Sequence, residues 1–174
     1  MKKITTKQIA LISVLAAIYV VLSLISVGTN DFKVSVESFA VITGSVTIGP
    51  LGGFFIGLVG EFIHQITGPY GVDATTILWL LPYAIEGLLV GFIVKKEQGN
   101  ISNKRLITAI ILGEISLTIM VTIVNGLSAI IQGWGNWLTI SAAIPLRLGI
   151  MAVRIVLYCI VLPLLYGRLK KVIK

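Results

Sequence analysis

The sequence predicts an all-α integral membrane protein with six transmembrane helices and both termini in the cytoplasm. Hydrophobic residues make up 56% of the 174 residues and charged residues only 12%, against about 45–50% and about 25% in an ordinary soluble domain. The mean hydropathy is +1.02. Because one span needs about 20 apolar residues, the chain has room for about six or seven crossings. We therefore expect one transmembrane domain over residues 1–174 and no separate catalytic domain.

The apolar residues form five stretches: Ile9–Val27, Ser38–Thr67, Thr76–Val94, Leu106–Ile131 and Leu138–Leu165. The first follows a basic start and resembles a signal peptide, but it is long enough to span and has no small-residue cleavage site. We expect it to be retained as the first helix. The second stretch would form a helix of roughly 45 Å at about 1.5 Å per residue, which exceeds a hydrocarbon core of about 30 Å.

The segment Gly49-Pro50-Leu51-Gly52-Gly53 interrupts that long stretch, and glycine with proline commonly ends a helix. The distribution of basic residues along the chain decides whether this segment is a kink within one helix or a hairpin between two. Most basic residues fall into three clusters, which are Lys2, Lys3 and Lys7; Lys95, Lys96, Lys104 and Arg105; and Arg168, Lys170, Lys171 and Lys174. Five spans would place the last two clusters outside, whereas a hairpin gives six spans and places all three in the cytoplasm, as the positive-inside rule requires.

The helices on either side of the hairpin are expected to have roughly 12 to 16 residues each, so they must tilt little, thin the bilayer or pack inside the protein. Residues 31–37 alternate polar and apolar side chains, which indicates an extended segment over the outer face. Two sets of glycines then form small-residue faces for close helix packing: Gly53, Gly57 and Gly60, and Gly87 and Gly91. Residue Pro145 is expected to loosen the start of the sixth helix.

Five ionisable residues lie within the expected spans: Glu61, Glu86, Glu114, Arg147 and Arg154. Each costs on the order of 2.5–3.5 kcal/mol in hydrocarbon by insertion scales, which makes each a functional candidate. Mutual pairing is the structural alternative, because the two arginines are seven residues apart and share one helix face.

The expected depth in the membrane divides these ionisable residues into two groups. Arg147, Glu61 and the single histidine His64 are expected in the outer half, where they can face one cavity. Glu86 and Glu114 lie deeper, where pairing with Arg154 explains them. The spacing Glu61-x-x-His64 matches that of di-metal helix bundles, but the chain has no second copy, so we expect no metal site.

Aromatic residues gather at the expected outer ends: Tyr70, Trp79, Tyr83, Trp134 and Trp137. An interfacial belt would explain them, yet no tryptophan lies at the inner boundary. This asymmetry favours a mouth lined with rings that stack on a flat heterocycle. Polar groups are added there by Asn125, Gln132 and Asn136.

Together these segments resemble the substrate-binding S components of energy-coupling factor (ECF) vitamin transporters. The resemblance rests on the basic start, the first-helix sequence Ala-Leu-Ile-Ser-Val-Leu-Ala-Ala, the loop Phe-Lys-Val-Ser-Val-Glu, the Gly-Pro-Leu-Gly-Gly turn with Gly57 and Gly60, and six spans in 174 residues. It implies a non-enzymatic subunit of the prokaryotic plasma membrane that captures a vitamin with high affinity. Its implied partners are a transmembrane scaffold subunit and two ATPases.

The resemblance also implies where ligand and scaffold bind. An Ala-x-x-x-Ala pattern on the first helix contacts the scaffold in this family, and the present chain has Ser13-x-x-x-Ala17 instead. The ligand regions of the family map onto Lys33, Trp79, Tyr83, Trp134, Asn136 and Arg147. With Glu61, His64, Tyr70 and Asn125, these residues form the predicted site. A folate-like molecule is the first candidate for the substrate, because the aromatic side chains suit a flat ring and Arg147 and Lys33 suit a carboxylate. Pantothenate, riboflavin and cobalamin are the other candidates.

Two other function classes compete with this interpretation. A proton-coupled secondary transporter would use Glu61, Glu86 and Glu114 as a proton path, but the sequence has no repeat of the kind common in such carriers. An intramembrane enzyme lacks a nucleophile and base at a recognisable spacing. The net charge of +7 is expected to set topology in the lipid bilayer, so we expect no nucleic-acid partner. We also expect no cofactor.

Overall fold

The computed structural model describes residues 5–25, 27–29, 32–68, 71–97, 100–133 and 135–173. Its elements follow in the order α1 (Thr6–Leu24), β1 (Val27–Thr29), β2 (Phe32–Val34), α2 (Ser38–Thr47), α3 (Pro50–Thr67), α4 (Thr76–Val94), the 3-10 helix η1 (Lys95–Glu97), α5 (Asn103–Gln132), α6 (Trp137–Ala142) and α7 (Ile144–Ile173). Helices dominate, as predicted. Among the described elements, α1, α4, α5 and α7 are long and apolar enough to cross a membrane.

The first helix lies three residues earlier than the sequence predicts. Thr5 accepts a hydrogen bond from the Gln8 amide, and the Gln8 side chain accepts one from the Thr5 amide, a capping box that fixes the start of α1. The predicted end at Val27 is wrong, because Val27 pairs with Val34 in the antiparallel ladder of β1 and β2. A short apolar run does not distinguish the end of a helix from a strand. The predicted extended segment is confirmed over β2.

The predicted hairpin in the second apolar stretch is confirmed. Gly49 separates α2 from α3 with φ 110°, a conformation that glycine adopts without the steric cost of a Cβ. Pro50 follows in the first turn of α3, where its missing N–H leaves no bond unmade. The two helices have 10 and 18 residues, so the hairpin divides the stretch less evenly than predicted.

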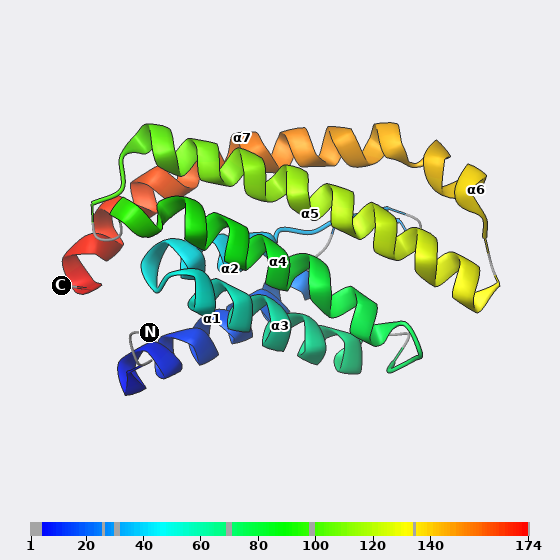
Figure 1. Ribbon diagram of the computed structural model, residues 1–174, viewed down its shortest axis with the longest axis horizontal. Coiled ribbons are helices and arrows are strands. Elements are labelled where there is room, and N and C mark those ends of the chain that lie inside the picture. Colours follow the sequence, from blue (N-terminus) through cyan, green and yellow to red (C-terminus); the bar gives the residue numbers. More distant parts are fainter. Residues whose placement is uncertain are drawn as a thin grey trace.

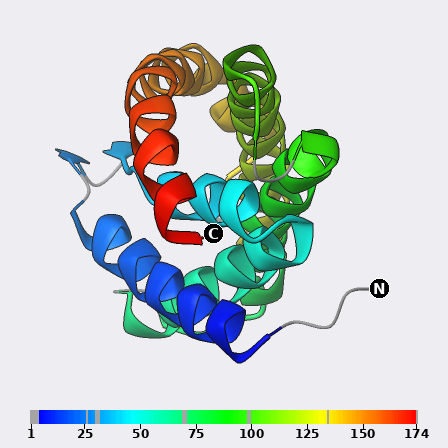
Figure 2. The same ribbon diagram turned by 90° about the vertical axis from the view of Figure 1, so that its left-hand side faces the viewer.

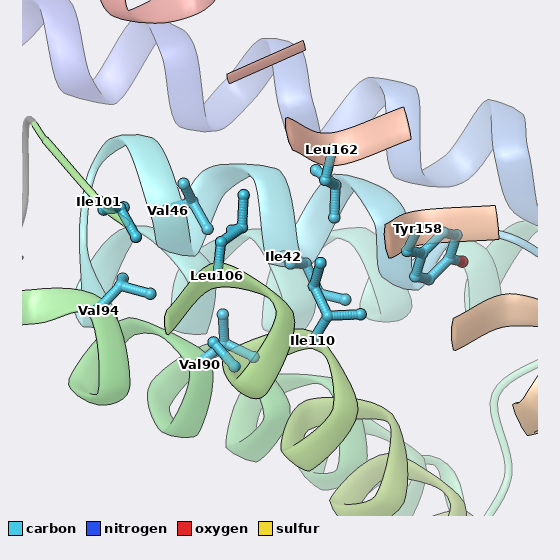
Figure 3. Packing of buried hydrophobic residues seen from close by; sticks show 10 residues of the cluster. Ile42, Val46, Val90, Val94, Ile101, Leu106, Ile110, Tyr158 and Leu162 are labelled. Atoms are coloured by element: carbon cyan, nitrogen blue, oxygen red, sulfur yellow. The ribbon is translucent and has the colours of Figure 1, made fainter. Parts of the chain in front are cut away.

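Helix α2 is the centre of the molecule. Figure 2 shows it surrounded by α1, α3, α4 and α7, and nearly all of its residues are buried. This short apolar helix therefore packs inside the protein, which is one of the three possibilities that the sequence allows. An apolar cluster joins α2 to α4, α5, α7 and the α4–α5 connection (Figure 3), and its members include Ile42, Val46, Val90, Val94, Ile101, Leu106, Ile110, Tyr158 and Leu162.

Helices α3 and α4 pack so closely that their backbones touch. A Cβ placed on Gly87 would lie 2.3 Å from the carbonyl carbon of Gly53, and one placed on Gly57 would lie 2.5 Å from the carbonyl oxygen of Tyr83. Likewise, a Cβ on Gly91 would lie 2.4 Å from the Cα of Pro50. The predicted packing role of these glycines is confirmed.

The sequence predicts one helix over the last apolar stretch, but the structure divides this stretch into two helices. Ala143 separates α6 from α7, and Pro145 occupies the first turn of α7. Proline has no N–H to continue a preceding helix but is tolerated in a first turn. The long helix therefore begins at Ile144, and α6 becomes part of the connection from α5.

The ends of the chain gather on one side. Figure 1 shows the start of α1, the α2–α3 turn, the α4–α5 connection and the end of α7 at the same end of the molecule. The α3–α4 and α5–α6 connections lie at the opposite end. The basic residues that the structure describes in the three clusters therefore share one end.

Candidate functional site

A buried polar cluster ties α2, α5 and α7 together at the first residue of α2. Ser38 donates a hydrogen bond from Oγ to Glu114 Oε1 at 2.8 Å, and Tyr158 OH lies 2.9 Å from the same Oγ. Because the single hydroxyl proton of Ser38 goes to Glu114, Tyr158 is the donor in the second bond. Arg154 Nε lies 3.0 Å from Glu114 Oε2, with side-chain exposures of 11% and 0%. The predicted pairing of Arg154 with Glu114 is confirmed.

Glu86 does not join that ion pair. Its side chain on α4 is fully buried, and neither carboxylate oxygen has a hydrogen-bond partner among the described residues. It faces α5 one residue before Glu114, since a Cβ placed on Gly113 would lie 3.7 Å from Glu86 Oε1. The expectation that Glu86 also pairs with Arg154 is wrong, because among the described residues the ion pair of Arg154 is with Glu114.

A second polar group lies between α1 and α3. Tyr19 OH donates to Glu61 Oε2 at 2.6 Å, and Gln65 Nε2 donates to Glu61 Oε1 at 2.6 Å. One turn further along, His64 Nδ1 lies 2.9 Å from Ser23 Oγ. Glu61 and His64, predicted as ligand residues, thus make contacts that hold α3 against α1.

The ring of Tyr19 connects this group to the interior. Its centroid lies 5.3 Å from that of Tyr83 with an interplanar angle of 87°, an edge-to-face contact. Tyr83 OH donates to Glu37 Oε1, which also accepts from Ser35 Oγ at 2.6 Å. Glu37 is 4% exposed, and its Oε2 has no hydrogen-bond partner among the described residues. The predicted ligand residue Tyr83 therefore lies in the core next to a carboxylate that the sequence analysis did not single out.

The predicted outer residues lie on several elements. Arg147 on α7 is half-buried, and its Nη1 lies 3.5 Å from Thr122 Oγ1 on α5. Asn125 is half-buried less than one turn further along α5, and Trp79 is half-buried on α4. The common outer cavity expected for Arg147, Glu61 and His64 stays a prediction.

The remaining predicted residues lie at the edge of what is described. Asn136 Oδ1 accepts from the Leu138 amide at 3.1 Å at the start of α6. Lys33 lies in β2 opposite Gly28, and its side chain is outside the described part of the structure. Tyr70 and Trp134 lie outside the described residues altogether.

Asp73 organises the connection between α3 and α4. Its Oδ1 accepts from the amide and hydroxyl of Thr75 at 2.7 and 2.8 Å, and its Oδ2 accepts from Gln132 Nε2 at 2.6 Å. The hydrogen bonds from Thr75 lower the pKa of the Asp73 carboxyl below its ordinary value. This carboxylate therefore ties the loop before α4 to the last residue of α5.

Sequence reasoning missed Glu37, Ser38, Tyr158, Tyr19 and Asp73. Glu37 carried a usable signal, since an acidic residue directly before an apolar stretch is a natural first-turn group. Among the described residues, no three His, Cys, Asp or Glu side chains gather as a metal site would need. The described polar groups that take part in no ion pair include the half-buried guanidinium of Arg147 and the carboxylate oxygens of Glu86.

Comparison with known proteins gives one family over most of the chain. A family model described as the substrate-specific component of ECF transporters matches residues 7–166. A UPF0397 protein of Lactococcus lactis subsp. cremoris (strain NZ9000) is 33% identical over 113 residues, which are 62% of this chain and 60% of the relative. A UPF0397 protein of Streptococcus pneumoniae (strain CGSP14) is 30% identical over 95 residues, 53% of this chain and 50% of the relative. The matches thus span half to three-fifths of these relatives.

A solved structure shares the fold. It is described as the S component of a bacterial ECF transporter, and it aligns with a TM-score of 0.69 over 97% of this chain and 98% of its own. The sequence identity is 24%, so this likeness bears on the fold alone.

Proposed function

The chain belongs to the substrate-specific components of ECF transporters, and we propose that it captures a vitamin-like nutrient from outside the cell with high affinity. Family membership over residues 7–166 is the observation that carries this proposal. The fold is that of a multi-pass membrane protein.

The orientation proposed is six crossings with both termini in the cytoplasm. The start of α1, the α4–α5 connection and the end of α7 share one end of the molecule in Figure 1, and the basic clusters belong to these segments. The positive-inside rule assigns that end to the cytoplasm. The α3–α4 and α5–α6 connections then face outside, where the nutrient arrives.

The proposed substrate is an anion with a flat ring, of which a folate-like molecule is the first candidate. Arg147 supports this choice, because its described hydrogen bond goes to the neutral hydroxyl of Thr122, and no acidic partner is found among the described residues. A ligand carboxylate there would gain a charge-assisted hydrogen bond of about 1.5–3 kcal/mol. That energy corresponds to about 10- to 150-fold in affinity. Pantothenate, riboflavin and cobalamin remain alternatives.

The proposed partners are one transmembrane scaffold subunit and two ATPases. Ser13 and Ala17 are exposed on α1, away from the face formed by the buried residues Ile12, Leu15, Ala16 and Tyr19. Small side chains on an exposed face of a membrane helix permit close approach by another helix. We assign docking on the scaffold to this face.

Binding is tested by identifying the ligand that copurifies with the chain by mass spectrometry and titrating it into variants. Arg147→Gln should weaken binding at least tenfold while the protein folds normally. Arg168→Gln is the matched control, since Arg168 is an exposed arginine on the same helix and should leave affinity unchanged. Normal folding and unchanged affinity in Arg147→Gln would remove this residue from the site.

A proton-coupled carrier is the second candidate, because Glu86 and Glu114 are both fully buried on facing helices. Buried carboxylates of this kind serve as proton sites in carriers. Uptake by the chain alone in liposomes, driven by a pH gradient, would favour the proton-coupled carrier over the mechanism of an ECF transporter.

A further inference from the structure

Two buried carboxylates in the interior have oxygens without a hydrogen-bond donor. Among the described residues, these oxygens are Glu37 Oε2 and both Oε1 and Oε2 of Glu86. Glu37 is 4% exposed and Glu86 is 0% exposed, so the oxygens are shielded from bulk water. A buried acceptor that lacks a donor is costly. A site that keeps such acceptors is suited to a ligand that brings donors with it.

The charge balance of the described interior points to the same kind of ligand. Apart from His64 and the Glu97–Arg105 pair, the buried and half-buried acidic and basic side chains are those of Glu37, Glu61, Glu86, Glu114, Arg147 and Arg154. Four carboxyl groups thus face two guanidinium groups. Electrostatic repulsion from Glu37 acts on Glu86 and on Glu114, and the Arg154 guanidinium is paired with Glu114. The excess of carboxyl groups favours a ligand group rich in N–H donors.

Glu37 is better placed than Glu86 to meet a ligand. Its Oε1 accepts hydrogen bonds from Tyr83 OH and from Ser35 Oγ, which fix the carboxylate and leave Oε2 as the atom for a further bond. Glu37 directly precedes α2, and the positive end of the helix dipole favours a carboxylate at this position. Glu86 lies instead in the middle of α4, packed near Gly113 of α5.

The position of Glu37 along α2 also suits a ligand that arrives from outside. Helix α2 ends at the α2–α3 turn, which lies at the same end of the molecule as the α4–α5 connection (Figure 1). The proposed orientation places that end in the cytoplasm. The first turn of α2 therefore faces the opposite, outer side, together with Tyr83, which is a predicted ligand residue on α4.

We propose that Glu37 determines specificity, with Oε2 accepting a hydrogen bond from the ring of the nutrient. The ligand class is an amino-substituted nitrogen heterocycle, in which an amino group and a ring N–H share one edge. This inference rests on the proposed function, because it assigns the other end of the molecule whose carboxylate Arg147 would bind. A folate-like molecule has such an edge. Riboflavin has a ring N–H without an amino group, and pantothenate has no ring.

The test compares folic acid with desamino-folic acid, which lacks only the amino group of the pterin ring. Both compounds are titrated into the purified full chain in neutral detergent, and tryptophan fluorescence reports binding. The wild type should bind folic acid about tenfold or more tightly than the analogue, because the analogue leaves a buried acceptor without its donor. Glu37→Gln should bind folic acid about 10- to 150-fold more weakly and should lose the preference between the two compounds.

Two matched variants separate this role from others. Glu97→Gln makes the same change in the α4–α5 connection and should alter neither affinity. Arg147→Gln should weaken both compounds by the same factor, because both keep the carboxylate. A purely structural Glu37 would also weaken both equally in Glu37→Gln, so an unchanged preference in that variant overturns the inference. The comparison in the wild type does not depend on the folding of any variant.

The remaining outcomes distinguish this inference from the proposed function. Equal affinity of the wild type for the two compounds overturns the role of Glu37, while weaker binding in Arg147→Gln would still support capture of an anionic nutrient. If neither compound binds, the copurified nutrient identified by mass spectrometry decides. A nutrient with an amino-substituted ring that Glu37→Gln binds more weakly supports the inference, and one without such a ring overturns it. A chain that binds no nutrient at all contradicts both proposals.

Discussion

Removing Arg154 should destabilise the protein before it affects ligand binding. The guanidinium Nε lies 3.0 Å from Glu114 Oε2, and the two side chains are 11% and 0% exposed. Arg154→Ala would leave the Glu114 carboxylate with only the hydrogen bond from Ser38. Removing one partner of a buried ion pair typically lowers the stability by about 3–5 kcal/mol, because the remaining charge is uncompensated. We expect a loss of that size in the free energy of unfolding.

The assay is reversible unfolding in mixed micelles at neutral pH, with a double-mutant cycle. Glu114→Gln alone leaves Arg154 buried and unpaired, so it should also be strongly destabilising. The double variant Arg154→Met/Glu114→Gln removes both charges and should lose less stability than either single variant. Arg168→Ala, an exposed arginine of α7, should stay within about 0.5 kcal/mol of the wild type. If Arg154→Ala keeps wild-type stability and loses ligand affinity instead, Arg154 is a ligand residue and the structural assignment is refuted.

Three further predictions concern the helix contacts, the outer connection and the docking face. Gly87→Ala should lower the free energy of unfolding by about 1–3 kcal/mol, because its Cβ would lie 2.3 Å from the Gly53 backbone. Gly149→Ala, where a Cβ meets nothing within 4 Å, should be neutral or stabilising. Equal effects of the two substitutions would contradict the close packing. The lowered pKa of Asp73 means that its contribution to stability is present above the unfolded pKa and is lost as the pH falls through the folded pKa. The protection factors of the amides at residues 73–76, which correct the hydrogen-exchange rates for their intrinsic pH dependence, should therefore fall in acid in the wild type and stay constant over that range in Asp73→Asn. An identical acid response of the protection factors in both proteins would remove Asp73 as the cause. Ser13→Trp and Ala17→Trp should each block copurification with a coexpressed scaffold while leaving ligand affinity intact, and normal assembly of both variants would exclude this face of α1.

Local chemistry explains which parts of the fold could be predicted from the sequence. The turn at Gly49 and Pro50 follows from the conformations that these two residues allow, and the pairing of Arg154 with Glu114 follows from the cost of a lone charge in the membrane. The break at Ala143 was missed because hydropathy is continuous across residues 138–165, although Pro145 marked its position.

The polar contacts of the interior could not be predicted in the same way. Tyr19 and Glu61 are 42 residues apart in the chain, and Ser38 and Tyr158 are 120 apart. Such pairs depend on how the helices pack, and neither spacing nor composition encodes that packing. The contacts of Glu61 with Tyr19 and of His64 with Ser23 are of the same kind, and the ligand role of Glu61 and His64 stays a prediction.

Uptake in reconstituted liposomes tests the central claim most directly. The chain, the scaffold and the two ATPases are reconstituted together, and accumulation of the copurified nutrient is measured with ATP inside and with the proton gradient collapsed. The ECF assignment predicts uptake that requires ATP hydrolysis and the partner subunits and that survives collapse of the gradient. Uptake by the chain alone that follows an imposed pH gradient and ignores ATP would contradict it.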